Sequence, residues 1–258
     1  MTRKYFFFDI DGTLVNWNED GPIGVPESTQ EALRLLRENG HFTALATGRS
    51  YAMAERYLSE LGFDNMVCDG GNGIVLDGKL IDIEPLDKDL ACALVDECNE
   101  KGFIWGIQPD ISCTRYVPDE RFDEATQDVY MRNKIVPGLD PRDYEKIYKV
   151  YVVCDYPKEL ELETLKKLPY CRFGLKYIFV EPAEKSRGIK KIMETLGADP
   201  KDVVVFGDHY NDMSMFLPEW TSIAMGNAVD ELKARASFVT TAVGDDGIYN
   251  ACRHFGWI

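Results

Sequence analysis

The feature that most constrains this chain is a short apolar run that ends in two aspartates. Tyr5-Phe6-Phe7-Phe8 is continuously apolar, which is typical of a strand buried on both faces of a parallel sheet. It leads directly into Asp9-Ile10-Asp11-Gly12-Thr13, so two carboxylates follow the strand where the chain turns at a glycine. Ligands of open α/β sheets bind at that edge. Two desolvated carboxylates would repel one another there unless a cation lies between them, although alone the pentapeptide could also be a turn and a helix cap.

Charge and composition exclude several classes of function. With 258 residues and a formal charge of -15, the chain is not expected to bind nucleic acid or an anionic membrane through bulk charge. A phosphorylated substrate would also be repelled at long range, so its site needs local positive charge from a metal, a lysine or backbone amides. The N-terminus has no signal-peptide pattern, no apolar stretch approaches the ~20 residues of a membrane span, and the seven scattered cysteines include no CxxC pair. These observations predict a cytoplasmic protein with reduced thiols.

Strands and helices alternate at both ends of the chain. The patterning predicts a helix over 27–38, a strand over 41–46, a helix from 51, a strand over 66–68 and a hairpin around Asp77-Gly78. Alternation resumes with a helix over 186–196 and a strand over 202–206. This alternation of strands and helices is typical of an α/β domain built on a parallel sheet.

The middle of the chain follows a different pattern. It predicts helices over 87–101, 119–132 and 158–168, separated by strands over 103–108, 113–117 and 147–154 and by two more that end near Val180. Neighbouring strands without an intervening helix predict an antiparallel sheet with helices on one face. We therefore expect one α/β domain, 1–84 plus 182–258, interrupted by an inserted α+β domain, 85–181, with the site in the crevice between them.

Three further segments place polar residues at strand ends or helix starts of the α/β domain. Thr47-Gly48-Arg49 offers a hydroxyl and amides for phosphate oxygens, although alone it could be an ordinary turn. Asp208 and Asp212, in Gly207-Asp208-His209-Tyr210-Asn211-Asp212, add two acids, although alone this segment could be a capped helix start. Four acids on one edge are costly without a cation, and oxygen ligands of this kind suit Mg²⁺. Lys185 precedes a helix and would reduce the repulsion between a carboxylate nucleophile and an anionic substrate, although a lone lysine is more often a surface residue.

The order DxDGT, [ST]GR, lysine and GDxxND resembles the haloacid dehalogenase superfamily of phosphohydrolases. The inserted domain lies between the second and third of these signals and resembles the type IIB cap of the Cof-like group. The resemblance covers essentially the whole chain and implies a Rossmann-like, doubly wound parallel-sheet core. One departure is that Ser186-Arg187 separate Lys185 from Gly188, whereas the family's lysine is usually followed directly by glycine.

The resemblance also implies roles for single residues. Asp9 would be the nucleophile that forms an aspartyl phosphate, and Asp11 the acid that protonates the leaving alcohol and then deprotonates water. Mg²⁺ would be held by an Asp9 carboxylate oxygen, the Asp11 backbone carbonyl, Asp208, and Asp212 directly or through water. The phosphoryl group would be bound by Thr47, Gly48, Lys185, Asn211 and Asn72.

These roles predict a phosphatase of small phosphorylated metabolites, with sugar phosphates as the expected substrates. The cap would select the leaving group, and its candidate contacts are Trp105, Arg115, Tyr116, Arg132 and Arg172. Two alternatives use similar residues: a phosphomutase on the same scaffold, and a non-enzymatic phospho-acceptor domain of the receiver type. Receivers are about half this length and lack an inserted domain, which favours the enzyme.

Overall fold

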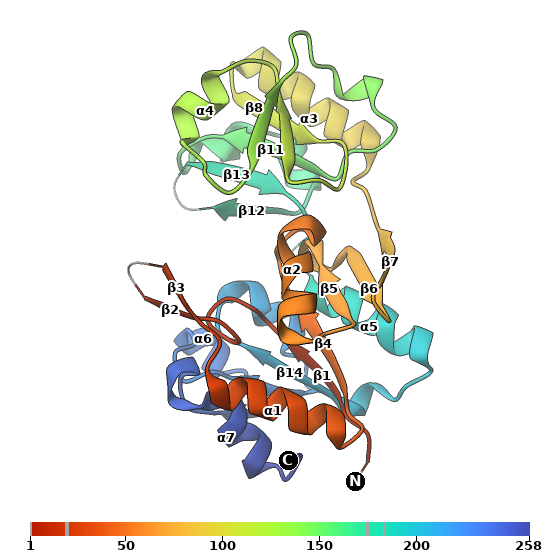
Figure 1. The fold of residues 1–258 in the computed structure, drawn as a ribbon. Helices are drawn as coiled ribbons and strands as arrows, with labels where there is room; N and C mark the ends of the chain where they lie inside the picture. Colours follow the sequence, from red (N-terminus) through yellow and green to blue (C-terminus); the bar gives the residue numbers. More distant parts are fainter. Residues whose placement is uncertain (1, 19–20, 174–175, 183) are drawn as a thin grey trace. The chain divides into compact units, whose positions relative to one another are not determined.

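The computed structural model describes residues 2–18, 21–173, 176–182 and 184–258. Residues 1, 19, 20, 174, 175 and 183, which fall within the predicted domains, lie outside the described residues. By their internal packing the residues divide into two compact units (Figure 1). Met1–Arg49, Ala54–Asp82 and Glu184–Ile258 form the first unit, here called the core, and Ser50–Met53 with Ile83–Ala183 form the second, here called the cap.

The core is built on an eight-stranded sheet in the order β16-β15-β14-β1-β4-β5-β6-β7. Strand β1 pairs in parallel with β14 on one side and β4 on the other, whereas β5 and β6 are antiparallel. The α/β class predicted from the sequence is therefore confirmed, with a sheet that is mixed at one end. The strands are β1 Tyr5–Phe8, β4 Phe42–Ala46, β5 Met66–Cys68, β6 Gly73–Leu76, β7 Lys79–Ile83, β14 Val203–Gly207, β15 Thr221–Ala224 and β16 Phe238–Val239.

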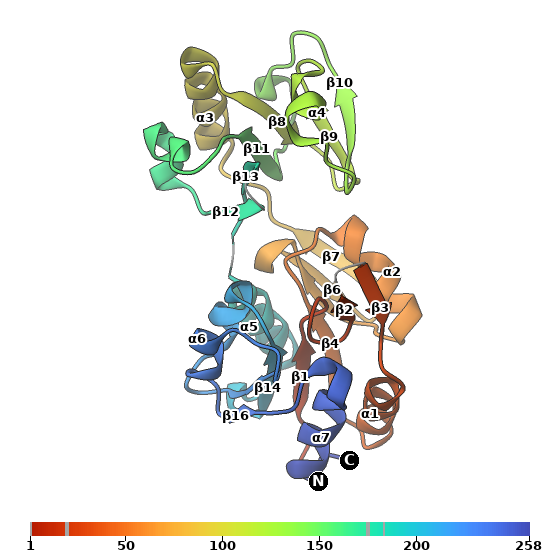
Figure 2. The ribbon, with the colours of Figure 1, turned by 90° about the vertical axis from the view of Figure 1, so that its left-hand side faces the viewer.

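Helices cover both faces of this sheet. Ile189, Ile192 and Met193 of α5 pack with Phe7 in one apolar cluster. Phe6 points to the opposite face, where its ring lies 4.9 Å from that of Trp257, just beyond α7. In Figure 2, α5 accordingly lies on one side of β1 and α1 on the other. The core helices are α1 Glu27–Glu38, α5 Lys185–Leu196, α6 Asp230–Lys233, α7 Gly247–His254 and, from Ala54 onward, α2 Tyr51–Leu61.

Short elements complete the core. A two-stranded hairpin, β2 Asn16–Asn18 and β3 Gly21–Gly24, follows the first aspartates and was not predicted. At the predicted hairpin between β6 and β7, Asp77 and Gly78 both have positive φ, as a tight turn of this kind requires. Four 3₁₀ segments are Asp69–Gly71, Pro200–Asp202, Tyr210–Met215 and Val243–Asp245.

The cap contains a six-stranded sheet in the order β10-β9-β8-β11-β13-β12. Val150 and Val152 of β11 pack with α3, whereas Tyr151, between them, packs with Phe122 of α4. Because alternate residues of a strand point to opposite faces, the two helices cover opposite faces, and the prediction that helices cover one face is wrong. The elements are α3 Lys88–Lys101, β8 Ile104–Gln108, β9 Thr114–Val117, α4 Arg121–Thr126, β10 Arg132–Ile135, β11 Lys149–Val153, β12 Tyr170–Phe173, β13 Tyr177–Val180 and a 3₁₀ turn, Pro141–Asp143.

Two predicted cap helices are wrong for identifiable reasons. The helix predicted over 119–132 ends at Thr126, because Gln127 takes a left-handed conformation and the chain then enters β10. The helix predicted over 158–168 is two 3₁₀ pieces, Lys158–Glu161 and Thr164–Lys167. There the backbone N–H groups of Glu163 and Thr164 donate to the Glu97 carboxylate, at 2.8 Å each, instead of continuing a helix.

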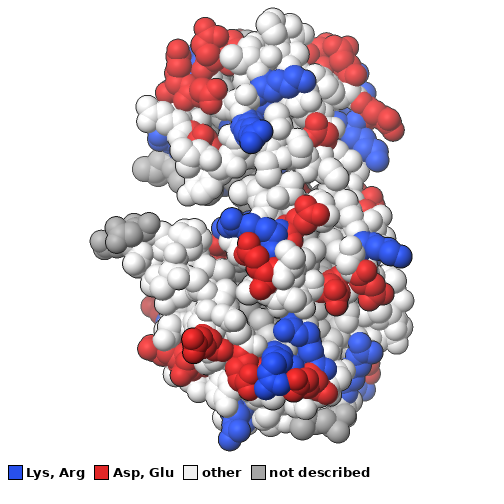
Figure 3. Space-filling view, viewed as in Figure 1, with Lys and Arg blue, Asp and Glu red and all other residues white. Residues whose placement is uncertain are grey.

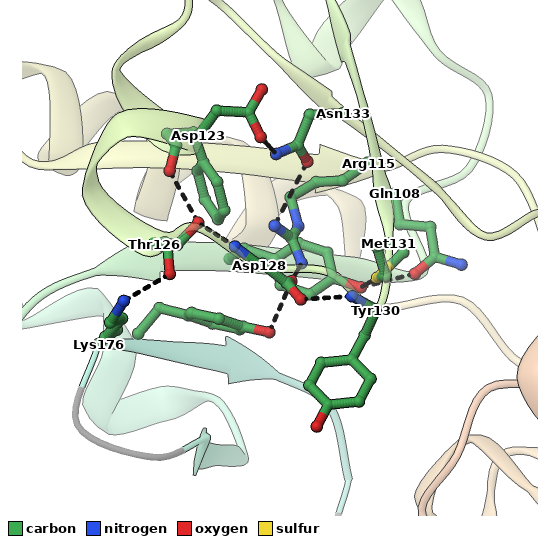
Figure 4. Close-up of polar contacts among 12 residues, drawn as sticks. Gln108, Arg115, Asp123, Thr126, Asp128, Tyr130, Met131, Asn133 and Lys176 are labelled. Carbon is green, nitrogen blue, oxygen red and sulfur yellow. Dashed lines mark hydrogen bonds and ion pairs between the residues drawn. The ribbon is translucent and has the colours of Figure 1, made fainter.

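A buried arginine organises the face of the cap under α4 (Figure 4). Arg115 is 0% exposed and donates to the Asp128 carboxylate at 2.7 Å. Its guanidinium carbon lies 4.3 and 4.1 Å from the ring centroids of Phe122 and Tyr151. Asp128 also accepts from the hydroxyl of Tyr177 at 3.0 Å. Arg115 was a candidate contact of the leaving group in the sequence. In the structure it forms a buried ion pair with Asp128 that holds the chain after α4.

The surface of the core carries interleaved charges where Figure 3 shows it. Over α1, for example, Arg34 pairs with Glu31 and Glu38, so acidic and basic side chains alternate. In the described parts of the chain, no helix has both the length and the apolar character needed to cross a membrane.

Candidate active site

Three polar segments meet at one edge of the core sheet. Asp9 follows β1 and Thr47 follows β4, and the parallel register of these strands brings both strand ends to the same edge. Asp208 follows β14, which pairs with β1 on the other side, and the Asp9 backbone N–H donates to the carbonyl of Phe206 at 3.1 Å. The buried strand predicted from the apolar run therefore positions the aspartates as expected for an open α/β sheet.

A buried lysine links two of the four predicted acids. Lys185, the first residue of α5, is 1% exposed. Its Nζ donates to Oδ1 of Asp9 at 2.5 Å and to Oδ1 of Asp212 at 2.6 Å. Asp9, Asp212 and Asp208 each present a carboxylate oxygen within 4.8 Å of the others. The alternative that Lys185 is an ordinary surface lysine is excluded by this burial.

The backbone around Asp208 is shaped to fit the carboxylates. Oδ2 of Asp212 accepts from the backbone N–H groups of Asp208 and His209, at 2.8 and 3.1 Å. Thr13 donates its hydroxyl to Oδ1 of Asp208 at 3.0 Å. A Cβ on Gly12, whose φ is +81°, would lie 2.2 Å from Oδ2 of Asp208, so only glycine allows this approach. Gly12 and Thr13, which follow the first two aspartates, therefore both help to position the Asp208 carboxylate.

Burial and mutual repulsion raise the pKa values of two of the clustered acids, Asp9 and Asp208. Desolvation, followed by the charge of Asp212, raises the pKa of Asp9 well above its ordinary value. The same two causes raise the pKa of Asp208 to about 7. For Lys185, burial favours the neutral amine, but the charges of Asp212 and Asp9 outweigh it and raise the pKa, so this side chain is an ammonium at neutral pH. Crowded carboxylates with raised pKa values are typical of functional sites.

The second aspartate of the first motif has a different partner. Both oxygens of Asp11 accept from Arg49, from Nε and from an Nη, each at 2.7 Å. Asp11 is 40% exposed and Arg49 19%. The hydroxyl oxygen of Thr47, which is buried, accepts from the backbone N–H of Arg49 at 3.1 Å. Arg49 belongs to the [ST]GR signal, but the sequence offers no way to see that it would face Asp11.

The remaining predicted residues lie in two places. The side-chain nitrogen of Asn211 is 3.7 Å from the position that a Cβ on Gly48 would take, so these two residues are neighbours. Asn72 is buried, and its Oδ1 accepts from Arg187 at 3.0 Å. The loop before it abuts the start of α5, because the Glu184 N–H donates to the Gly70 carbonyl at 2.8 Å. The structure thus brings together Asp9, Asp208, Asp212 and Lys185, brings Gly48 to Asn211, and ties Asn72 to the helix of Lys185.

The donor set fits a hard divalent cation. Carboxylate oxygens are the ligands that Mg²⁺ prefers, and three carboxylates offer oxygens within 4.8 Å of one another. Lys185 supplies one positive charge against these three acids. Burial, followed by the charge of Asp212, raises the pKa of Asp9 and of Asp208, and a divalent cation held by these oxygens would favour their ionised forms.

Comparisons with known proteins agree with this fold. The sequence model of the haloacid dehalogenase-like hydrolases matches residues 6–252. YkrA of Bacillus subtilis (strain 168), named as a candidate phosphatase, is 30% identical over 260 residues, which cover 99% of each chain.

Solved structures give the same result. A hypothetical protein from Geobacillus kaustophilus HTA426 superimposes with a TM-score of 0.84 at 31% identity, covering 100% of both chains. The HAD subclass IIB sugar phosphatase BT4131 superimposes with a TM-score of 0.77 at 25% identity, covering 99% of this chain and 100% of the other.

The family match and the similar proteins therefore identify this chain as a phosphoric monoester hydrolase. The chain belongs to the haloacid dehalogenase-like hydrolases, and its structural neighbours include phosphatases of subclass IIB. The resemblance drawn from the four sequence motifs is confirmed. Phosphatases of this family typically use a divalent metal, in agreement with the acidic cluster described above.

Proposed function

We propose that this protein is a Mg²⁺-dependent phosphatase that hydrolyses small phosphomonoesters, sugar phosphates among them, through an aspartyl phosphate on Asp9. The observation that carries the proposal is the ammonium of Lys185, held at 2.5 Å from Asp9 inside a buried acidic cluster. A nucleophilic carboxylate must approach an anionic phosphoryl group, and a fixed cation beside it lowers their repulsion.

The reaction has two half-steps. In the first, an Asp9 oxygen bonds to phosphorus while the bond from phosphorus to the leaving oxygen breaks, and Asp11 gives its proton to that oxygen. In the second, Asp11 takes a proton from water, the water oxygen bonds to phosphorus, and the bond to Asp9 breaks. Inorganic phosphate leaves and both aspartates return to their starting forms.

The other predicted residues bind the phosphoryl group and the cation. The phosphoryl oxygens would be held by Lys185, the Thr47 hydroxyl, the Gly48 amide, Asn211 and Asn72. Mg²⁺ would be held by an Asp9 carboxylate oxygen, the Asp11 backbone carbonyl, Asp208, and Asp212 directly or through water. When bound, the cation offsets the charge that accumulates on the phosphoryl oxygens.

The substrate class is supported by the relatives and by the charge of the chain. BT4131 is described as a sugar phosphatase. For a small phosphorylated metabolite, the local positive charge of Lys185 and a bound cation would offset the repulsion from the acidic chain. A net charge of -15 disfavours polyanionic partners such as nucleic acid or an anionic membrane surface. Seven free cysteines fit a reducing, cytoplasmic setting.

Phosphate release from p-nitrophenyl phosphate and from a panel of hexose phosphates tests the proposal. We expect turnover with Mg²⁺, loss of turnover with excess EDTA, and loss of turnover in Asp9→Asn. Unchanged activity of that variant, or in EDTA, would contradict the mechanism. An isomeric sugar phosphate instead of free phosphate would indicate a phosphomutase, and a long-lived phosphoprotein after treatment with a small phosphodonor would indicate a phospho-acceptor domain.

A further inference from the structure

Arg49 binds the side chain of Asp11, the residue to which the proposed mechanism assigns proton transfer. Its Nε and one Nη each donate to a different oxygen of Asp11, at 2.7 Å, so the carboxylate plane is fixed at two points. Such a bidentate contact sets the direction of a carboxylate, which a single hydrogen bond does not. Asp11 must present an oxygen to the leaving group and later to water, so the direction of this carboxylate matters to both half-steps.

The arginine itself is held at both ends. Its backbone N–H donates to the Thr47 hydroxyl oxygen at 3.1 Å, and its carbonyl accepts from the N–H of Asp69 at 2.9 Å. Its guanidinium carbon lies 5.5 Å from the ring centroid of Tyr57, a buried residue of α2. A side chain fixed by its backbone and beside an aromatic ring is suited to orient its partner.

We propose that Arg49 is a positioning residue that orients Asp11 for proton transfer to the leaving group and from water. The inference rests on the proposed function, because it assigns Arg49 a role only if Asp11 is the proton donor. It differs from a role in which Arg49 binds the substrate phosphate itself, because that role would serve every phosphomonoester alike.

Two substrates of different leaving-group basicity separate these roles. The leaving group of a hexose phosphate is an alkoxide, which needs the proton from Asp11. The leaving group of p-nitrophenyl phosphate is a stable phenolate, which needs that proton little. The value of kcat/KM reports the first half-step. We expect Arg49→Gln to lower kcat/KM about 10²-fold for the hexose phosphate, since a small misplacement of a catalytic group costs on that order, and much less for p-nitrophenyl phosphate.

Arg49→Lys keeps the charge but cannot make two parallel contacts, so it should show the same substrate dependence. In the Asp11→Asn background, Arg49→Gln should cause almost no further loss for the hexose phosphate. Arg56→Gln is the matched control, because Arg56 contacts the same Tyr57, at 2.9 Å from its hydroxyl, and should leave both substrates unaffected.

Equal losses for the two substrates, a rise in KM alone, or full additivity with Asp11→Asn would overturn the proposal. Thermal melts of each variant identify any loss that comes from unfolding, and Arg49→Lys then still decides the question. A failure of the proposed function looks different, because the unaltered protein would not release phosphate from either substrate or Asp9→Asn would stay active.

Discussion

Replacing Lys185 by methionine removes a buried positive charge. We expect this change to lower both the stability of the protein and its activity. Nζ of Lys185 lies 2.5 Å from Asp9 and 2.6 Å from Asp212, and neither carboxylate has water to replace it, because all three residues are buried. Removing one partner of a buried ion pair destabilises a protein by about 3–5 kcal/mol. In a chain of this size, that lowers the melting temperature by roughly 6–20 °C.

The assay is thermal unfolding with EDTA and with Mg²⁺, together with steady-state kinetics. We expect Lys185→Met to melt well below the unaltered protein in EDTA, and Mg²⁺ to restore more stability to the variant, because the cation then supplies the missing charge. Activity with Mg²⁺ should still fall by about 10²–10³-fold, as for other groups that stabilise transition-state charge. Lys190→Met, on the exposed side of the same helix, is the control for the change of side chain. An unchanged melting temperature of Lys185→Met in EDTA would refute the electrostatic reasoning.

Three further changes test other parts of the account. Gly12→Ala would place a Cβ 2.2 Å from an Asp208 oxygen, so the Mg²⁺ concentration for half-maximal activity should rise by about 10–100-fold; an unchanged Mg²⁺ titration would count against the site. Because burial raises the pKa of Asp208 to about 7, protons compete with the cation below that pH, and the half-maximal Mg²⁺ concentration should rise as pH falls through 7; no pH dependence would contradict this. Asp128→Asn breaks the buried pair with Arg115 and should destabilise the cap by about 3–5 kcal/mol, seen by circular dichroism during heating. Although burial raises the pKa of Asp128, the hydrogen bond from Arg115 lowers it below 3.8 overall, so its stabilisation is present above that pH and is lost as pH falls through the folded value; the variant should lack this acid dependence.

The sequence predicts those elements that depend on the burial or the backbone conformation of a few consecutive residues. The apolar run before Asp9 is a central strand, because burial on both faces requires consecutive apolar residues. Asp77-Gly78 is a hairpin turn, because residues that tolerate positive φ are required there. The clustering of Asp9 and Asp208 was predictable because parallel strands end at one edge. Lys185 begins a helix, and only the family resemblance placed it beside Asp9.

Long-range pairings were not predictable in the same way. The chain after Thr126 has helical patterning, but Arg115 holds Asp128 in a buried pair and the chain leaves the helix. The Glu97 carboxylate likewise takes the backbone N–H groups on which a helix through Glu163 would depend. In both cases a partner distant in sequence overrides the local preference. The contact of Arg49 with Asp11 has the same origin, because motif spacing does not reveal which side chains face one another.

In the proposed mechanism, the phosphoryl group passes through a covalent bond to Asp9. Its most direct test is rapid acid quenching of the protein during turnover of p-nitrophenyl phosphate with Mg²⁺, followed by mass spectrometry of the N-terminal peptide. We expect a peptide heavier by one phosphoryl group, with the modification on Asp9, sensitive to hydroxylamine and absent in Asp9→Asn. Turnover without that adduct in a quench fast enough to capture it, or an adduct on another residue, would contradict the account.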